Sequence, residues 1–284
     1  MGRLLQFSDV HFGVEHAGAC AAALDYAHAA APDLVLVTGD VTQKGLPPEF
    51  AAAARWIAAL PGPVFVTVGN HDVPYYDVLA RLFWPWRAFE TIIGHPAHDH
   101  EHRGDGLMVR GVTTARGWQA RLNWSKGAID LEQTRRAAAA LAAAPTGHLR
   151  ILACHHPLIE MAGAPMTGEV RRGDRAARIF AEAGVDLVMT GHVHVPFALP
   201  IQRGDGCSYA VGCGTLSRRE RGAPPGFNRV EWDAHVIVVT AVAWIDGGFV
   251  DQETWRLPRR QDTRHVETRP TIPDVDAAMT TAAV

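Results

Sequence analysis

Five short segments of the chain carry closely spaced histidine, aspartate and asparagine residues. They are Asp9-Val10-His11, Gly39-Asp40, Gly69-Asn70-His71-Asp72, His155-His156-Pro157 and Gly191-His192-Val193-His194. Histidine nitrogens and carboxylate oxygens are donors that suit Zn, Fe, Mn or Co. One such segment by itself is usually no more than a capped turn, but five of them together predict a metal centre.

Each segment follows a short apolar run, and these runs cover residues 4–7, 34–37, 64–68, 149–153 and 185–189. Short continuous runs rich in valine and leucine are typical of strands buried on both faces. Because ligands gather at the carboxyl ends of strands in an open α/β sheet, we expect the polar side chains to converge. Seven candidate ligands are too many for one tetrahedral zinc site and suit two ions that share a carboxylate.

Alanine-rich segments with helical spacing lie between the apolar runs, at residues 16–30, 48–60, 131–143 and 174–183. Pro47-Pro48 fits a helix start, and Asp130 followed by Gln133 resembles a capping pair. After Cys207, closely spaced strands are predicted at 209–211, 228–232 and 236–244. We therefore expect an α/β fold, a four-layer αββα sandwich of two mixed sheets flanked by helices.

The length and composition predict one main domain over residues 1–257, in which 74–110 is an insertion rich in aromatic residues and histidines. The polar, proline-containing tail at 258–284 is expected to be mobile or to lie over a neighbouring surface. The histidine-rich run at 95–102 suggests a third metal site or a solvated loop. Its spacing matches neither a helix nor a zinc finger, which favours the loop.

Several classes of protein are disfavoured by the bulk properties. A net charge of −3 gives no sign of the basic surface that binding a nucleic-acid polymer requires. No run approaches 18 apolar residues, so we expect no membrane span. The sequence shows no secretory signal, and its four cysteines lack C-x-x-C spacing, which favours reduced thiols and a cytoplasmic protein. The oligomeric state stays open, with a homo-oligomer as one option.

The five segments occur in the order D-x-H, G-D, G-N-H-D, H-H-P and G-H-x-H, and in this the chain resembles the calcineurin-like metallophosphoesterase family. The resemblance covers about residues 4–195 and implies a pair of metal ions. One ion would be held by Asp9, His11, Asp40 and His194, and the other by Asp40, Asn70, His155 and His192. A hydroxide that bridges two such ions attacks phosphorus in line with the leaving oxygen.

The resemblance also places His71 beside the phosphate, where it would stabilise the transition state or protonate the leaving oxygen. Asp72 would orient His71. His156 is expected to lie behind a metal ligand and fix its tautomer, and a hydrogen-bonded, half-buried histidine is the alternative. Arg171 and Arg172 are candidates for contact with a substrate phosphate or carboxylate, and a solvated face is the alternative.

The stretch Gly39-Asp40-Val41-Thr42-Gln43-Lys44-Gly45 lacks the G-D-x-x-D pattern of protein phosphatases and of the family's nucleases. Together with the segment at 153–157, it resembles the bacterial class III cyclic nucleotide phosphodiesterases. A small phosphodiester is therefore the expected substrate, with 3′,5′-cyclic nucleotides first. Glycerophosphodiesters, lipid-linked pyrophosphates and phosphomonoesters are the alternatives. A metal-bound scaffold without catalysis is an alternative of another class, but every expected ligand position is filled.

Overall fold

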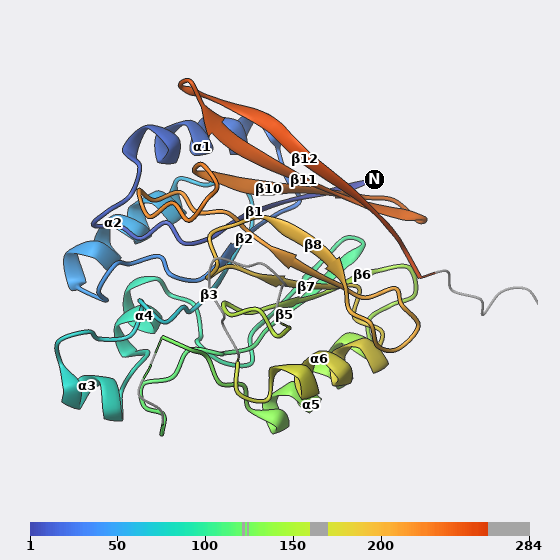
Figure 1. Ribbon diagram of the computed structural model, residues 1–284, viewed down its shortest axis with the longest axis horizontal. Coiled ribbons are helices and arrows are strands. Elements are labelled where there is room, and N and C mark those ends of the chain that lie inside the picture. Colours follow the sequence, from blue (N-terminus) through green and yellow to red (C-terminus); the bar gives the residue numbers. More distant parts are fainter. Residues whose placement is uncertain (121–122, 124, 160–169, 261–284) are drawn as a thin grey trace, which may run out of the picture.

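The computed structural model describes residues 1–120, 123, 125–159 and 170–260, which form two six-stranded sheets (Figure 1). The first sheet contains β1 (Gly2–Phe7), β2 (Leu34–Thr38), β3 (Val64–Thr67), β10 (Gly226–Trp232), β11 (Val236–Ile245) and β12 (Gly248–Pro258). The second contains β4 (Glu101–Gly104), β5 (Leu107–Gly111), β6 (Leu149–Ala153), β7 (Leu187–Thr190), β8 (Phe197–Pro200) and β9 (Tyr209–Gly212). The described helices are α1 (Ala17–Ala30), α2 (Pro47–Ala58), α3 (Val78–Phe83), α4 (Arg87–Ile92), α5 (Leu131–Ala142) and α6 (Gly173–Glu182).

Both sheets are mixed, and each has a parallel half that carries the predicted site. The first sheet has the strand order β12-β11-β10-β1-β2-β3, with β1, β2 and β3 parallel to one another. The second has the order β4-β5-β6-β7-β9-β8, with β5, β6, β7 and β9 parallel. The remaining pairings are antiparallel. The parallel halves place the carboxyl ends of successive strands at a common edge of each sheet.

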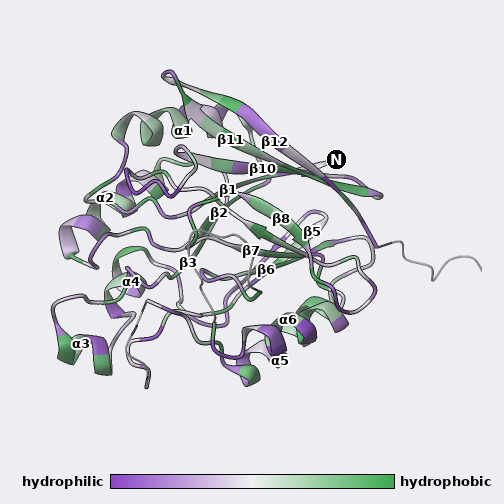
Figure 2. Cartoon of the chain, in the orientation of Figure 1, coloured by the Kyte–Doolittle hydropathy of each residue, from purple (hydrophilic) through white to green (hydrophobic). Residues whose placement is uncertain are grey.

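Three apolar clusters separate four layers, which confirms the predicted αββα sandwich. The first lies between α1, α2 and the outer face of the first sheet, and the second lies between α5, α6 and the outer face of the second sheet. The third fills the space between the two sheets, where Leu36 and Ile151 are fully buried. Figure 2 shows the apolar strands inside and polar residues on the outer sides of α5 and α6.

The four predicted helices are present within one or two residues at each end. Ala19, Ala23 and Ala27 are buried on one face of α1, so their spacing of four forms the stripe that packs on the sheet. Asp130 caps α5 by accepting from the backbone N–H groups of Glu132 and Gln133. Gln133 does not complete a capping box, because its side-chain oxygen accepts from the backbone of Thr113 instead.

The proposed insertion at 74–110 is shorter than the sequence suggested. Its last residues form β4 and most of β5, and β5 pairs in parallel with β6 inside the second sheet. The histidine-rich run at 95–102 is also not simply a solvated loop. The ring of His100 stacks on Phe65 with 4.0 Å between centroids, and its Nε2 lies 3.0 Å from the carbonyl oxygen of Val66.

The ordered C-terminal region extends further than the predicted boundary at residue 257. Strand β12 was missed because it is a polar, mostly exposed edge strand, yet it pairs with β11 along its length. Arg259 then donates to the carbonyl oxygens of Asp233 and Gly147, and Arg260 forms ion pairs with Asp205 and Asp186. Residues 261–284 of the predicted tail lie outside the described residues.

Two further predictions bear on the class of the protein. All four cysteines are free thiols, and Cys20, Cys154 and Cys213 are buried. In the described part of the chain, no helix combines the length and the apolar character that crossing a membrane requires.

Candidate metal centre

The fold brings all seven predicted metal ligands together between the two sheets. Asp9, Asp40 and Asn70 follow β1, β2 and β3 of the first sheet, and His155 and His192 follow β6 and β7 of the second. His11 lies two residues after Asp9, and His194 lies two residues after His192. Each of the seven is at most 9% exposed. The centre therefore forms where the carboxyl ends of both parallel halves meet.

The backbone of these turns is held in an unusual conformation. Nine described residues other than glycine have a positive φ, and five of them are predicted ligands: Asp9 (52°), His11 (50°), Asp40 (50°), His192 (68°) and His194 (61°). Left-handed conformations cost side-chain-bearing residues free energy and cluster at functional sites. Glycine is required nearby, since a Cβ on Gly69 would lie 2.1 Å from Asp40 Oδ1. The strained backbone of these turns is therefore associated with the predicted ligands.

The predicted ligands of the first ion face one another. His194 Nε2 lies 3.3 Å from His11 Nε2 and 3.1 Å from Asp9 Oδ1. His11 Nε2 is also 3.7 Å from Asp9 Oδ1 and 3.8 Å from Asp40 Oδ2. Four donor atoms from two sheets thus surround one small volume.

The predicted ligands of the second ion meet on the other side of Asp40. His155 Nε2 lies 3.2 Å from Asp40 Oδ2 and 3.2 Å from Asn70 Oδ1. The ring of His192 is 5.2 Å from the ring of His155, between centroids. Asp40 Oδ2 is therefore close to ligands of both groups, as the predicted bridging carboxylate should be.

Backbone carbonyl groups fix the tautomers of three of these histidines. Nδ1 lies 3.2 Å from the carbonyl oxygen of Thr42 in His11, 2.8 Å from that of Thr38 in His155, and 2.6 Å from that of Arg219 in His194. Because a carbonyl oxygen only accepts, each Nδ1 carries a proton, and each Nε2 is left to face the centre. Protein-bound metal ions are held by histidines arranged in this way.

The electrostatics of the cluster favour added positive charge. Burial alone would raise the pKa of Asp9, but His194 and His155 hold it below its ordinary value. Burial disfavours the charged form of His155, yet Asp40 and Asp9 raise its pKa to about 9. Asp9 Oδ1 and His192 Nε2 are buried without a hydrogen-bond partner in the described chain. Unpaired acceptors around two carboxylates fit metal cations.

His71 lies beside this cluster and is half-buried. Its backbone N–H donates to Asp40 Oδ1 at 2.8 Å, and its Nδ1 donates to the carbonyl oxygen of Gln43 at 2.7 Å. Its ring is 4.8 Å from the ring of His11, between centroids. His71 is therefore held with Nε2 at the edge of the metal centre.

Asp72 has a different role from the one predicted. Its Oδ1 accepts from the backbone N–H and the hydroxyl of Thr42, and its Oδ2 accepts from the N–H of Gly69. These bonds tie the turn after β2 to the turn after β3, while the imidazole of His71 is oriented by Gln43. Asp72 thus positions the loops that carry Asp40 and His71. Burial first, and then Asp40, raises its pKa to about 6.

His156 is a buried, hydrogen-bonded histidine and does not set the tautomer of a ligand. Its Nε2 donates to the carbonyl oxygen of Ser125 at 2.8 Å, and its Nδ1 lies 2.8 Å from Thr114 Oγ1. Burial, with His155 nearby, lowers its pKa to about 3, so the ring is neutral at neutral pH. It packs 4.4 Å from the ring of His192 and supports that ligand by contact.

Arg171 and Arg172 are exposed and are not part of the metal cluster. Both line a cavity with Arg116 at the N-terminal end of α6. The groups of histidine, cysteine and acidic side chains close enough to share an ion, in the chain as described, all lie in the strand-end cluster. None of those groups includes the histidines at 95–102.

Two arginines of the site were missed from the sequence. Arg219 Nη1 lies 3.0 Å from His71 Nε2, 3.4 Å from His11 Nε2 and 3.3 Å from Gln43 Oε1. Arg221 donates to the carbonyl oxygen of His192 at 2.9 Å. Both belong to the connection between β9 and β10, where the only sequence signal was a short charged run.

Solved structures share the fold. A purple acid phosphatase from yellow lupin (Lupinus luteus) seeds aligns with a TM-score of 0.61 and 15% identity, over 91% of this chain and 54% of that one. This chain thus spans about half of the lupin phosphatase. A calcineurin-like phosphoesterase from Bacillus subtilis aligns with a TM-score of 0.50 and 12% identity, over 91% of this chain and 90% of that one.

Sequence comparisons give one curated relative and one matching family model. A protein of Synechococcus sp., named a probable cyclic nucleotide phosphodiesterase, is 22% identical over 86% of this chain and 92% of its own length. Residues 2–196, which include all seven predicted ligands, match the sequence model described as calcineurin-like phosphoesterase. The chain is therefore a member of the calcineurin-like phosphoesterase family.

Proposed function

We propose that this phosphoesterase hydrolyses a small phosphodiester at a centre of two metal ions, with 3′,5′-cyclic nucleotides as the first candidates. One observation carries the two-ion proposal. Asp40 Oδ2 lies 3.8 Å from His11 Nε2 and 3.2 Å from His155 Nε2. The same carboxylate oxygen is therefore close to a ligand of each ion. Mn, Fe, Zn or Co would suit these donors.

In this proposal the seven ligands divide between two ions as the family resemblance implies. Asp9, His11, Asp40 and His194 would hold one ion, and Asp40, Asn70, His155 and His192 the other. When bound, the pair of ions supplies a water of lowered pKa as nucleophile and offsets the charge of the phosphate. The remaining steps depend on side chains of the chain itself.

His71 is the residue best placed to protonate the leaving oxygen. Its Nδ1 is occupied by Gln43, so Nε2 is the atom that faces the reacting phosphate. Arg219 donates to this Nε2 at 3.0 Å, so Nε2 carries no proton in this arrangement. A phosphate that engages the guanidinium would free Nε2 to take up a proton, and the resulting imidazolium would donate that proton to the leaving oxygen. His71 and Arg219 thus act together on the side of the centre that is open to substrate.

Replacing Arg219 with glutamine is expected to lower kcat/KM by about 10²–10³-fold, because a charge-assisted donor to the phosphate is lost. Metal content should stay at the wild-type level, since His194 is oriented by the backbone carbonyl of Arg219, which the substitution keeps. Steady-state kinetics and metal analysis check both points. Arg218→Gln, an exposed neighbour, is the matched control. Wild-type kinetics in Arg219→Gln would remove this residue from the mechanism.

The phosphodiester assignment is supported by the resemblance to class III phosphodiesterases and by the name of the Synechococcus relative. Its test is hydrolysis of bis(p-nitrophenyl) phosphate against p-nitrophenyl phosphate, with Mn²⁺ and after chelation. Chelator-sensitive turnover that favours the diester is expected, and a panel of cyclic nucleotides and glycerophosphodiesters would then rank substrates. Preference for the monoester would make the protein a phosphatase. Two bound ions without turnover of either ester would favour the scaffold alternative.

We also propose that the protein works in the cytoplasm, where thiols stay reduced. Its four free cysteines support this location.

A further inference from the structure

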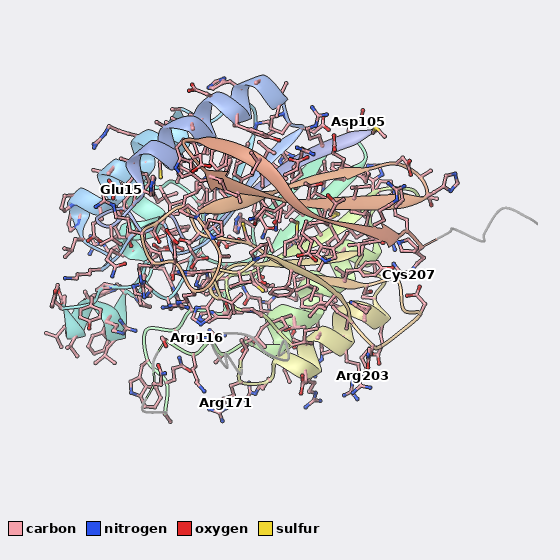
Figure 3. The ribbon with its side chains drawn as sticks, turned by 45° about the horizontal axis from the view of Figure 1, so that its top comes forward. Glu15, Asp105, Arg116, Arg171, Arg203 and Cys207 are labelled. Atoms are coloured by element: carbon pink, nitrogen blue, oxygen red, sulfur yellow. The ribbon has the colours of Figure 1, made fainter. Side chains whose placement is uncertain are left out.

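A cavity of about 520 Å³ opens where α5 and α6 begin. Asp130, the N-cap of α5, and Arg172, the N-cap of α6, both line it, together with Arg116, Trp118 and Arg171. Arg116 and Arg171 lie on the same lower side of the molecule in Figure 3. No predicted metal ligand lines this cavity, so it is a separate feature of the surface.

The lining of the cavity is net positive, because it contains three arginines and one aspartate. Arg116, Arg171 and Arg172 take part in none of the ion pairs found between described side chains. Asp130 Oδ1 is already occupied by two backbone N–H groups of α5. Burial and the nearby Arg172 lower the pKa of Arg116, although Asp130 opposes this. Three arginines around one small space thus favour an anionic occupant.

The local backbone favours the same kind of occupant. Arg172 has a φ of 70°, and no side chain caps the first turn of α6. The uncapped N-terminal end of α6 also contributes partial positive charge to the cavity, whereas Asp130 offsets that of α5. Arg116 is fixed by donating from Nε to the carbonyl oxygen of Ala128 at 3.0 Å.

An aromatic surface completes the cavity. Trp118 lines it and is 60% exposed. An exposed indole offers a flat apolar face on which a planar ring can stack. Arginine guanidinium groups beside it can bind a phosphate through paired N–H donors.

The cavity is distinct from the metal centre but lies close to it. Arg171 N donates to the carbonyl oxygen of Gly127, and Gly127 packs against the ring of His156. His156 in turn lies 4.4 Å from the ring of His192. One layer of chain therefore separates the arginines from the predicted ligands.

We propose that this cavity is a second binding site, which takes a phosphorylated ligand with a planar ring, of the nucleotide class. Adenosine monophosphate (AMP) serves as the probe. The proposal does not depend on the phosphodiesterase assignment, because the arginines and Trp118 contact no predicted metal ligand in the described contacts.

Calorimetric titration of AMP into the full chain tests the proposal, with metal-loaded and chelated protein. Binding should persist after chelation, because the cavity needs no metal. Arg116→Ala/Arg171→Ala should weaken it by about tenfold or more, and Trp118→Ala by about threefold or more. Arg178→Ala, an exposed arginine of α6 that does not line the cavity, is the matched control and should bind AMP like the wild type.

Three outcomes would overturn the proposal: AMP binding that vanishes on chelation, unchanged affinity in the double variant, or adenosine binding as tightly as AMP. If pyrophosphate binds as tightly as AMP, the planar base does not contribute to binding, and its proposed stacking on Trp118 is wrong. Circular dichroism monitors folding of the chelated protein and the variants. If the double variant fails to fold, Arg171→Gln and Arg172→Gln at exposed positions provide the same comparison. Loss of diesterase activity alone would leave these binding results unaffected.

Discussion

Replacing Asp40 with alanine is expected to release both metal ions and to lower turnover by at least about 10³-fold. Asp40 Oδ2 is the atom that both groups of ligands share, so its loss weakens each ion's coordination at once. An ion that polarises the phosphate contributes several kcal/mol to the transition state, and each 1.36 kcal/mol changes the rate about tenfold. Metal analysis and hydrolysis of bis(p-nitrophenyl) phosphate measure the two effects together.

Two further variants make the Asp40 experiment specific. Asp40→Asn keeps an oxygen for the hydrogen bond from the backbone N–H of His71 but removes the charge. It should therefore keep the local fold while still binding less metal. Asp105→Ala, an exposed carboxylate in the turn between β4 and β5 that Figure 3 labels, is the control and should behave as wild type. Full activity with two bound ions in Asp40→Ala would refute the bridging role.

Replacing His71 with alanine is expected to lower turnover by about 10²–10⁴-fold while leaving the metal content unchanged. The structure places its Nε2 beside Arg219 rather than between the carboxylates, which fits an acid catalyst. The defect should be smaller for bis(p-nitrophenyl) phosphate than for an alkyl diester, because p-nitrophenolate leaves with little need of a proton. Kinetics on both substrates therefore separate acid catalysis from substrate positioning.

The His71 experiment also decides between two roles for the imidazole. His71 lies close enough to His11 and Asp40 to share an ion with them. Loss of metal in His71→Ala would make it a ligand, and equal defects on both diesters would exclude its acting as an acid. His28→Ala, an exposed histidine of α1, controls for nonspecific effects of removing an imidazole.

The sequence by itself determined the strand-end residues and the layered fold. A strand, the turn that follows it and the polar side chain on that turn are neighbours in the chain, so their pattern can be recognised in the sequence. Five such patterns sufficed to place Asp9, Asp40 and His155 at strand ends, and the structure brings them together as expected. Helical spacing likewise predicted α1 and α5 because each buries one regular face.

The tertiary structure decided the features that depend on contacts between distant segments. Arg219 reaches His71 across 148 positions in the sequence, and no local pattern marks it. Asp72 does not orient its neighbour His71, because its two oxygens accept from the backbone N–H groups of Thr42 and Gly69. Edge strand β12 lacks an apolar pattern because most of its side chains are exposed, and its place in the sheet comes from backbone pairing with β11.

The cavity beside α6 also depends on contacts between distant segments and could not be predicted from the sequence. Arg171 was visible as a basic residue, but the chain alone could not distinguish a solvated charge from one facing another arginine. Only the pairing of Ala128 with Arg171 and the packing around it place Arg116 and Trp118 at the same cavity. Residue types and local spacing thus determine which chemistry is available, whereas long-range packing determines which groups act on the same ligand.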